Sequence, residues 1–479
     1  MDIIALITPL VEKIFEERKK LIENPESLSE FETEVHKSFD EAARKFMVKT
    51  LEDLDKGISE HNYRKAHYNI QRHDSRTLIT TVGDVTFNRT LFMNRESGKC
   101  RYLLDDMLRL DAHERFSEPA EAAMLAEAVK TSYREAASVL PTKSEITKTT
   151  VMNKVHSLTE WLPEETADEK KKVEYLLIDA DEDHIAEQHG RGSKGKNGSF
   201  MSRILYVYTG KEKECVGRKK LKDVHYIGGL YPGRDGIEKI WKEAWEYIKK
   251  NYDTKVLTKI YVCGDGAEWI KSCREYLPLS EFVLDKFHLM KHIHEATGWM
   301  LDSAEDARRD LYEMIVGNRM KRFTEYAELI ISKAPNPIPA EAMKTYVINN
   351  WEAIQTAYHD ENCEGCSAEG HVSHVFSSRM STRPMGWSQE GADSMSRLRC
   401  YHKNGGKIID LVKYNREKSR ERLKKTGTDD AEAVEARTRI DVGVHSSYDI
   451  DASYIDRIQA TIPGITAIKA YCISKHLRL

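Results

Sequence analysis

Residues 173–184 have the sequence Val173-Glu-Tyr-Leu-Leu-Ile-Asp-Ala-Asp-Glu-Asp-His184. The apolar run is typical of a buried strand, and it ends in a burst of acids. Because side chains alternate along a strand, Asp179, Asp181 and Asp183 share one face. Carboxylates at the end of a buried strand are costly unless a cation or a hydrogen-bond donor compensates them. The pattern therefore indicates a divalent metal site, with a surface loop as the alternative.

Strand and helix patterns alternate after this segment, up to about residue 285. Strands are predicted at 201–208, 224–231, 256–263 and 282–284, and helices at 237–250 and 267–275. Such alternation indicates an α/β sheet, whose first part occupies 173–285. Residues 286–360 carry only helical, charge-rich patterns and predict a helical insertion.

Two further acids follow predicted strands. In Cys263-Gly-Asp-Gly-Ala-Glu-Trp-Ile270, the glycines beside Asp265 allow a sharp turn and close approach of an ion, although a plain strand-to-helix turn has the same pattern. Ligands of α/β sheets gather at the carboxyl ends of strands. In Leu284-Asp-Lys-Phe-His288, Asp285 and His288 share a helix face and could bind each other or a phosphate; a capping Asp with a surface His is the alternative.

A Cys/His-rich stretch, Cys363-Glu-Gly-Cys-Ser-Ala-Glu-Gly-His-Val-Ser-His374, follows the helical block. Cys363, Cys366, His371 and His374 have the residue types of a tetrahedral zinc site, although the gap between the pairs is shorter than in the usual zinc finger. Glu369, between them, is equally a candidate ligand for a hard cation. The two uses are compatible.

The chain before residue 163 is organised differently. Apolar positions three and four apart predict a helical region at 1–76, and a period of two predicts a β-hairpin region at 77–116 around a Gly83-Asp84 turn. The region 117–162 has the pattern of a helix-turn-helix whose second helix presents Lys148 and Asn153, with two ordinary antiparallel helices as the alternative. The charged run at 163–172 predicts a domain boundary.

Composition limits the class of protein. With 479 residues, 40% hydrophobic and 32% charged, the chain predicts several globular domains rather than disorder. The stretch from Ile3 to Val11 is interrupted by Thr8 and Pro9, so we expect no membrane helix, and the acids around it argue against a secretory signal. Eight scattered cysteines indicate reduced thiols in a cytoplasm.

Four motifs occur in an order that resembles a known family: Asp181-Glu-Asp-His184, Gly264-Asp-Gly-Ala267, Gly365-Cys-Ser-Ala-Glu-Gly-His371 and Arg383-Pro-Met-Gly-Trp-Ser388. They resemble the DDE transposases of bacterial insertion sequences, specifically the ISLre type, which is related to the Mutator-like group. The likeness runs from the helix-turn-helix region to about residue 406. A transposase of this kind in a bacterial cytoplasm would be associated with the nucleoid.

The resemblance implies an RNase H-like catalytic domain with an α-helical insertion, completed by residues 361–410. The family's three acids fall on Asp181, Asp265 and Glu369, and its Asp-x-x-His motif ends at His288. Asp179, Asp183 and Glu390 stay open as alternative metal ligands. The implied cofactor is a pair of Mg²⁺ or Mn²⁺ ions, with which such enzymes cleave DNA and transfer strands without a covalent protein intermediate.

The implied partner is double-stranded DNA, both the terminal inverted repeats and the target. A net charge of −4 means that DNA binding must use local basic patches, and residues 189–224 hold ten Lys and Arg against three Asp and Glu. Besides the helix-turn-helix residues, the candidate DNA contacts are Arg191, Lys194, Lys196, Arg379, Arg383 and Trp387. The helical tail at 411–479 adds a basic segment, and joining two ends implies a homodimer or higher oligomer on DNA.

Three other functions fit part of the pattern. An RNase H-like nuclease without strand transfer would use the same acids but has no need of a terminal-repeat reader. A transposase-derived, non-catalytic DNA-binding regulator would keep the basic patches and lose an acid, whereas all three acids are present. A zinc-organised binding module would rest on the Cys/His-rich stretch alone.

Overall fold

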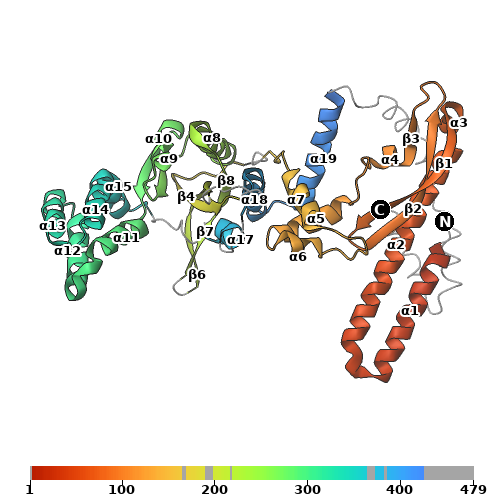
Figure 1. Ribbon diagram of the computed structural model, residues 1–479, viewed down its shortest axis with the longest axis horizontal. Coiled ribbons are helices and arrows are strands. Elements are labelled where there is room, and N and C mark those ends of the chain that lie inside the picture. The colour runs from red at the N-terminus through yellow and green to blue at the C-terminus, as the bar shows by residue number, and fades with distance from the viewer. Residues whose placement is uncertain are drawn as a thin grey trace. The chain divides into compact units, whose positions relative to one another are not determined.

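A computed structural model describes residues 3–163, 169–188, 198–215, 218–363, 373–381 and 386–425 (Figure 1). The chain divides into two compact units. Unit 1 comprises Met1–Ala128, Ser132–Val151 and Val412–Leu479, and unit 2 comprises Val129–Thr131 and Met152–Leu411. Among the described helices, none is both long and apolar enough to cross a membrane.

Unit 1 begins with a long helical hairpin. Helix α1 (Ile3–Glu23) packs against α2 (Leu28–Glu60) across a short 3-10 turn, η1 (Pro25–Ser27). The predicted amphipathic pattern is present, yet part of it faces solvent. Phe15 and Phe39 are 62% and 54% exposed, so the hairpin leaves large apolar side chains uncovered within unit 1.

A three-stranded sheet follows the short helix α3 (Asn62–His67). Strands β1 (Tyr68–Thr80) and β2 (Gly83–Asn94) pair antiparallel, and β3 (Cys100–Tyr102) adds to β2. The hairpin is present, but its turn is at residues 81–82 rather than at Gly83-Asp84, because Thr80 pairs with Gly83. Strand β1 also begins nine residues before the predicted start, through a polar run whose side chains are mostly exposed.

The rest of unit 1 is helical. Its elements are α4 (Leu103–Leu108), α5 (Glu118–Ala128), α6 (Tyr133–Ala137), the start of α7 (Lys148–His156) and most of α19 (Ile408–Lys425). Ser132 and Glu135 form a capping box that starts α6. Helix α6, the first predicted helix of the helix-turn-helix, is only five residues long. Residues 138–147 separate it from α7, and this connection is longer than the usual three- or four-residue turn.

Unit 2 is built on a five-stranded mixed sheet with the order β10-β9-β4-β5-β8. Its strands are β4 (Tyr175–Ala186), β5 (Ser199–Tyr208), β8 (His225–Gly229), β9 (Lys259–Gly264) and β10 (Ser280–Leu284). The first three are antiparallel in chain order, whereas β9 runs parallel to β4 and β10 runs parallel to β9. The predicted strands are thus all present. A separate hairpin, β6 (Gly210–Cys215) with β7 (Arg218–Lys222), was not predicted.

Helices cover the sheet. Helix α8 (Gly233–Asn251) connects β8 to β9 and buries Trp241 and Ile248 in the same cluster as Ile178 of β4. The short helices α9 (Glu268–Lys271) and α10 (Cys273–Tyr276) connect β9 to β10. Because β4 is buried on both faces, its apolar run is continuous, as the sequence predicts.

The segment after β10 is helical, as its sequence pattern predicts. It consists of α11 (Lys286–Thr297), η2 (Gly298–Ser303), α12 (Ala304–Val316), α13 (Met320–Lys333), α14 (Ile338–Asn349) and α15 (Trp351–His359). A π-helical turn η3 (Ser373–Ser377), α17 (Ser378–Met380) and α18 (Gln389–Lys403) then return to the sheet, where α18 packs against β8. The fold is therefore a mixed α/β, multidomain structure with a helical N-terminal region.

Candidate active site

Two carboxylates lie where the parallel pairing of β4 with β9 ends. Asp179 pairs with Cys263 in the β4–β9 register, so Asp181 and Asp265 extend from the same level of the two strands. Burial raises the pKa of Asp181 to about 6, and the negative charge of Asp265 adds to this rise. The strand order thus brings together two acids that are 84 residues apart in the sequence.

A histidine stands beside this pair. Asp285 follows β10 and caps α11, where one carboxylate oxygen accepts a hydrogen bond from the Phe287 N–H. The other oxygen lies 2.9 Å from Nδ1 of His288. The bond to Asp285 raises the pKa of His288, and the charges of Asp181 and Asp265 raise it further. A cationic imidazole is therefore favoured beside the carboxylates.

Two glycines allow the backbone conformation of the loop that carries Asp265. A Cβ at Gly264 would lie 2.6 Å from Ile270 Cδ1 and 2.9 Å from the Ala180 carbonyl oxygen, so no larger residue fits. Gly266 has φ +93°, a conformation that L side chains rarely adopt. One Asp265 oxygen accepts a 2.8 Å hydrogen bond from the Ala267 N–H, which fixes the carboxylate at the start of the next helix.

The insertion contributes a residue that sequence reasoning missed. The Tyr346 hydroxyl on α14 donates a 2.5 Å hydrogen bond to the main-chain carbonyl oxygen of Asp265. No motif surrounds Tyr346 in the sequence, so only the fold reveals its contact. The insertion thereby fixes the backbone of the Asp265 loop.

The donor set fits a divalent cation. Burial and the nearby charge of Asp265 make Asp181 costly to ionise, and a hard cation compensates such neighbouring carboxylates. Within the residues that the structure describes, no group of three or more Asp, Glu, His or Cys side chains is arranged to hold a metal. Glu369, the expected third acid, lies outside the described residues.

The alternative acids have other partners. Asp179 is fully buried and accepts hydrogen bonds from the hydroxyls of Tyr206 and Tyr208, at 2.9 and 3.1 Å. The Asp183 carboxylate accepts a bond from the Ser381 hydroxyl. Glu390 is exposed at the start of α18, 3.9 Å from the His156 imidazole. The charge of Asp265 helps to raise the pKa of Asp181, which faces it from β4.

Comparison with known proteins gives the family. The model of an uncharacterised protein family, UPF0236, matches residues 21–418. The chain belongs to the UPF0236 family. A UPF0236 protein of Caldanaerobacter subterraneus subsp. tengcongensis is 36% identical over 391 residues, covering 82% of this chain and 81% of that protein. A second from the same organism is 35% identical over 404 residues, covering 84% and 83%.

More distant matches add little. A UPF0236 protein in the vanSb 3′ region of Streptococcus gallolyticus is 24% identical, covering 81% of this chain and 85% of that protein. Among solved structures, the Drosophila P element transposase strand transfer complex matches with 11% identity, 68% coverage of this chain, 85% of that chain, and a TM-score of 0.21. At that TM-score the likeness carries no argument about fold or function.

Two residues of this UPF0236 protein that were predicted to contact DNA instead have a structural role within unit 2. Arg379 and Trp387 are 5% and 6% exposed, and the guanidinium lies 5.0 Å from the indole ring centre. The Trp387 main chain bonds to Ala186 and Gln188 at the end of β4, and its indole N–H donates to the Met380 carbonyl oxygen. Both side chains therefore help to attach the segment before α18 to the sheet, and they do not face outward.

Two cations of the basic helical tail have acidic partners within the protein. On α19, Arg416 forms an ion pair with Glu121, and Arg420 forms one with Asp111. These cations are neutralised within unit 1, so they are not available for DNA phosphates in this structure. By contrast, α7 buries Val151 and leaves Lys148 and Asn153 exposed, as the sequence predicts.

Several other predicted residues fall outside the described part of the chain: Arg191, Lys194, Lys196, Cys366, Glu369, His371 and Arg383. Of the predicted zinc ligands, Cys363 packs beside the apolar cluster of Tyr261 and Val283, and His374 is exposed. The zinc site stays a prediction.

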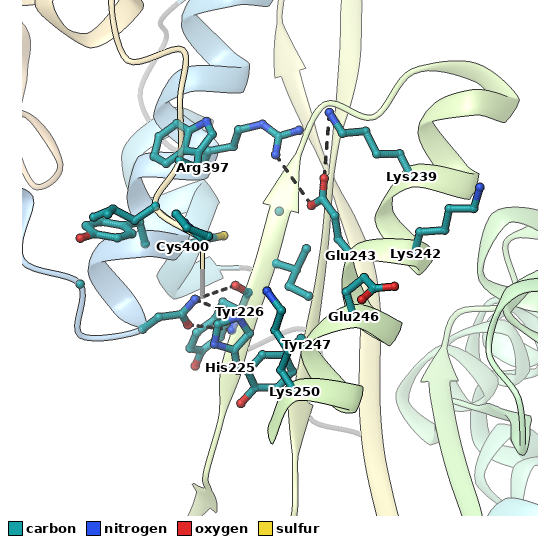
Figure 2. Close-up of a pocket in the computed structure, with 18 of the residues that line it drawn as sticks. His225, Tyr226, Lys239, Lys242, Glu243, Glu246, Tyr247, Lys250, Arg397 and Cys400 are labelled. Carbon is teal, nitrogen blue, oxygen red and sulfur yellow. Dashed lines mark hydrogen bonds and ion pairs between the residues drawn. The ribbon is translucent and has the colours of Figure 1, made fainter. Parts of the chain in front are cut away.

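A cavity of about 1090 Å³ lies between α8, α18 and the outer edge of β8 (Figure 2). Arg397 lies 3.9 Å from Glu243 within it. The Asn404 side chain accepts a bond from the Tyr226 N–H and donates one to the Tyr226 carbonyl oxygen, both at 2.8 Å. The amide thus takes the place of a neighbouring strand, a contact that no sequence pattern predicts.

Proposed function

We propose that this UPF0236 protein is a DDE transposase that cuts the DNA of an insertion sequence at its terminal inverted repeats and joins it to a target. The observation that carries the proposal is the pair Asp181 and Asp265, where the parallel pairing of β4 with β9 ends, with His288 beside it. Such a pair is suited to metal-dependent phosphoryl transfer.

The strand arrangement supports the proposal. Three antiparallel strands follow one another, and two strands parallel to the first lie on its other side, joined by helical crossovers. This order is the one that an RNase H-like domain would have, and the helical segment after the fifth strand is where the proposal expects an insertion. The first two acids of a DDE set would then occupy the positions of Asp181 and Asp265.

Asp181 and Asp265, with Glu369 as the third ligand, are the residues that would hold Mg²⁺ or Mn²⁺. A bound pair of ions would activate water or a DNA 3′-hydroxyl and stabilise the leaving oxygen. His288 is held by Asp285 at 2.9 Å, and its raised pKa favours the imidazolium. It is therefore suited to bind the scissile phosphate or to donate a proton.

The names of the relatives supply independent support. The name of the first Caldanaerobacter relative joins eleven locus designations, and that of the second joins four. One protein encoded at many places in a genome is what repeated copying of a mobile element produces.

Exposed residues suggest how the protein would assemble on DNA. Lys148 and Asn153 on α7 would read the terminal repeats, since Asn and Lys side chains can bond base edges. Phe15 on α1 and Phe39 on α2 would contact a second copy of the chain, because large apolar side chains exposed on a long helical hairpin are suited to packing against another hairpin.

The test is cleavage and joining of labelled DNA that carries the element's own ends. Wild type should nick at the element boundary and transfer strands with Mg²⁺ or Mn²⁺, and Asp265→Ala should do neither while still binding DNA. Glu268→Gln is the matched control, because Glu268 is a nearby acid that is 93% exposed and outside the pair. Glu369→Ala should also abolish cleavage; full activity of that variant would move the third ligand to Glu390.

Other outcomes identify the alternatives. Cleavage without joined product would indicate a nuclease, and binding without cleavage would indicate a DNA-binding regulator. About one zinc per purified chain would add a structural site at Cys363 and Cys366, and its absence would remove that site.

A further inference from the structure

We propose that a cavity beside the Asp265 loop binds an unpaired nucleobase of the DNA, next to the phosphodiester that is cut. This inference rests on the proposed transposase function and adds a substrate contact to it. The cavity has a volume of about 520 Å³, within the range of sites for small molecules. Its lining includes Gly266 and Lys271, His292 of α11, and Tyr346 and Asn349 of α14.

An aromatic pair forms one wall. The ring centres of His292 and Tyr346 are 4.1 Å apart, and their planes are inclined by 34°. Burial lowers the pKa of His292, so the imidazole is neutral at pH 7. A base that leaves the duplex loses its stacking neighbours, and aromatic side chains can replace them. The wall therefore has the chemistry to receive a flat, uncharged ring.

The charges argue against a site for phosphate alone. The lining contains the cationic Lys271 and the anionic Glu341, so the net charge of the cavity is close to zero. At the rim, the Asn349 amide and the Thr345 hydroxyl are exposed. Together they offer donors and acceptors, which the edge of a base requires. A heteroaromatic ring with a polar edge is the ligand class that matches these walls.

Tyr346 connects the cavity to the metal-binding loop. Its ring lines the cavity while its hydroxyl donates to the Asp265 carbonyl oxygen. On the same side, a Cβ at Gly266 would lie 3.3 Å from Asn350 Oδ1, so the loop packs closely on the insertion. Asn350 is 4% exposed, and its Oδ1 accepts no hydrogen bond from the described residues. A base on Tyr346 would therefore lie against the loop that carries the second acid.

The experiment measures base unstacking and cleavage together. Duplexes of the element's end carry a thymine at each position beside the cleavage site in turn, and permanganate, which oxidises unstacked thymines, reports on the complex. His292→Ala should lose the reactive thymine and cut about 5- to 150-fold more slowly, the range expected for one lost stacking contact. His294→Ala is the matched control, because His294 is exposed on the same helix and lies outside the cavity lining.

Asn349→Ala gives a second variant, since an exposed residue at the end of α14 can be truncated with little effect on folding. It should also reduce thymine reactivity. If wild type cuts but shows no unstacked thymine, or if His292→Ala and Asn349→Ala cut and react like wild type, the cavity does not bind a base. If wild type shows no metal-dependent cutting, the transposase proposal itself fails, and this inference fails with it.

Discussion

Replacing Asp181 by Asn should stabilise the metal-free protein at alkaline pH. The ordinary pKa of an aspartic acid is 3.8, and burial, with a smaller contribution from Asp265, raises that of Asp181 to about 6. The folded chain therefore binds this proton more tightly than the unfolded chain. Stability consequently falls as the pH rises from about 4 to about 6, and the full cost is present above that range.

The size of the effect follows from the pKa. A pKa that is about 2 higher in the folded chain corresponds to about 3 kcal/mol, at about 1.36 kcal/mol per pKa unit. This value is an upper bound, because Asp181 is partly exposed and solvent screens its charge. An uncharged asparagine of the same shape avoids the cost. The variant should therefore gain about 1 to 3 kcal/mol in free energy of unfolding at pH 8, which is several degrees in Tm.

Thermal and urea unfolding in EDTA would measure this gain. Asp181→Asn should exceed wild type at pH 8 and lose most of that advantage at pH 4.5. Adding Mg²⁺ should then raise the Tm of wild type and not that of the variant, because binding to the folded state stabilises it. Glu268→Gln should behave like wild type throughout. A variant less stable than wild type at pH 8, or stabilised equally by Mg²⁺, would refute the reasoning.

Three further outcomes are expected. The bond to Asp285 raises the pKa of His288, so the stabilising contribution of the imidazolium is complete below pH 6.5 and disappears as the pH rises through the folded pKa. In urea titrations, His288→Asn should therefore cost more stability at pH 6 than at pH 9. An equal cost at both pH values would contradict the ion pair. Gly266→Ala should lose about 1 to 2 kcal/mol because its φ is +93°, whereas Gly298→Ala, with φ −58° and open space around it, should be neutral or stabilising. Phe15→Glu with Phe39→Glu should keep the chain folded by circular dichroism, because both side chains are exposed, and should convert oligomers to monomers in sedimentation velocity; a wild type that is already monomeric would remove the proposed interface.

The sheet of unit 2 could be predicted because its strands are apolar on both faces. The apolar residues before Asp179 and before Cys263 would face water on both sides at a surface position. Both runs are therefore expected to be buried, and both form central strands. The start of β1 could not be predicted in this way, because its Asn, Gln, Arg, His and Asp side chains are mostly exposed. Backbone pairing with β2, and not burial of side chains, holds this part of β1 in a strand. Turn position was also missed, since Gly83 fits either side of a turn.

The candidate site was predictable only in its residue types. Spacing alone could not choose between Asp179 and Asp181, because both share a strand face. The choice depends on the two tyrosine hydroxyls that bond Asp179, and on the charge of Asp265 next to Asp181. Arg379 was misjudged for a related reason, because a motif does not show whether a cation faces solvent or a buried indole.

The hydrogen bond from Tyr346 to Asp265 has a consequence for biosynthesis. The two residues are 81 positions apart, and the strand that leads to Asp265 leaves the ribosome well before α14 does. The sheet can thus form while the loop at its edge still lacks the contact that fixes its backbone. A nascent or truncated chain would therefore have the acids without their final geometry, and competence to bind metal would arise only once the insertion has folded.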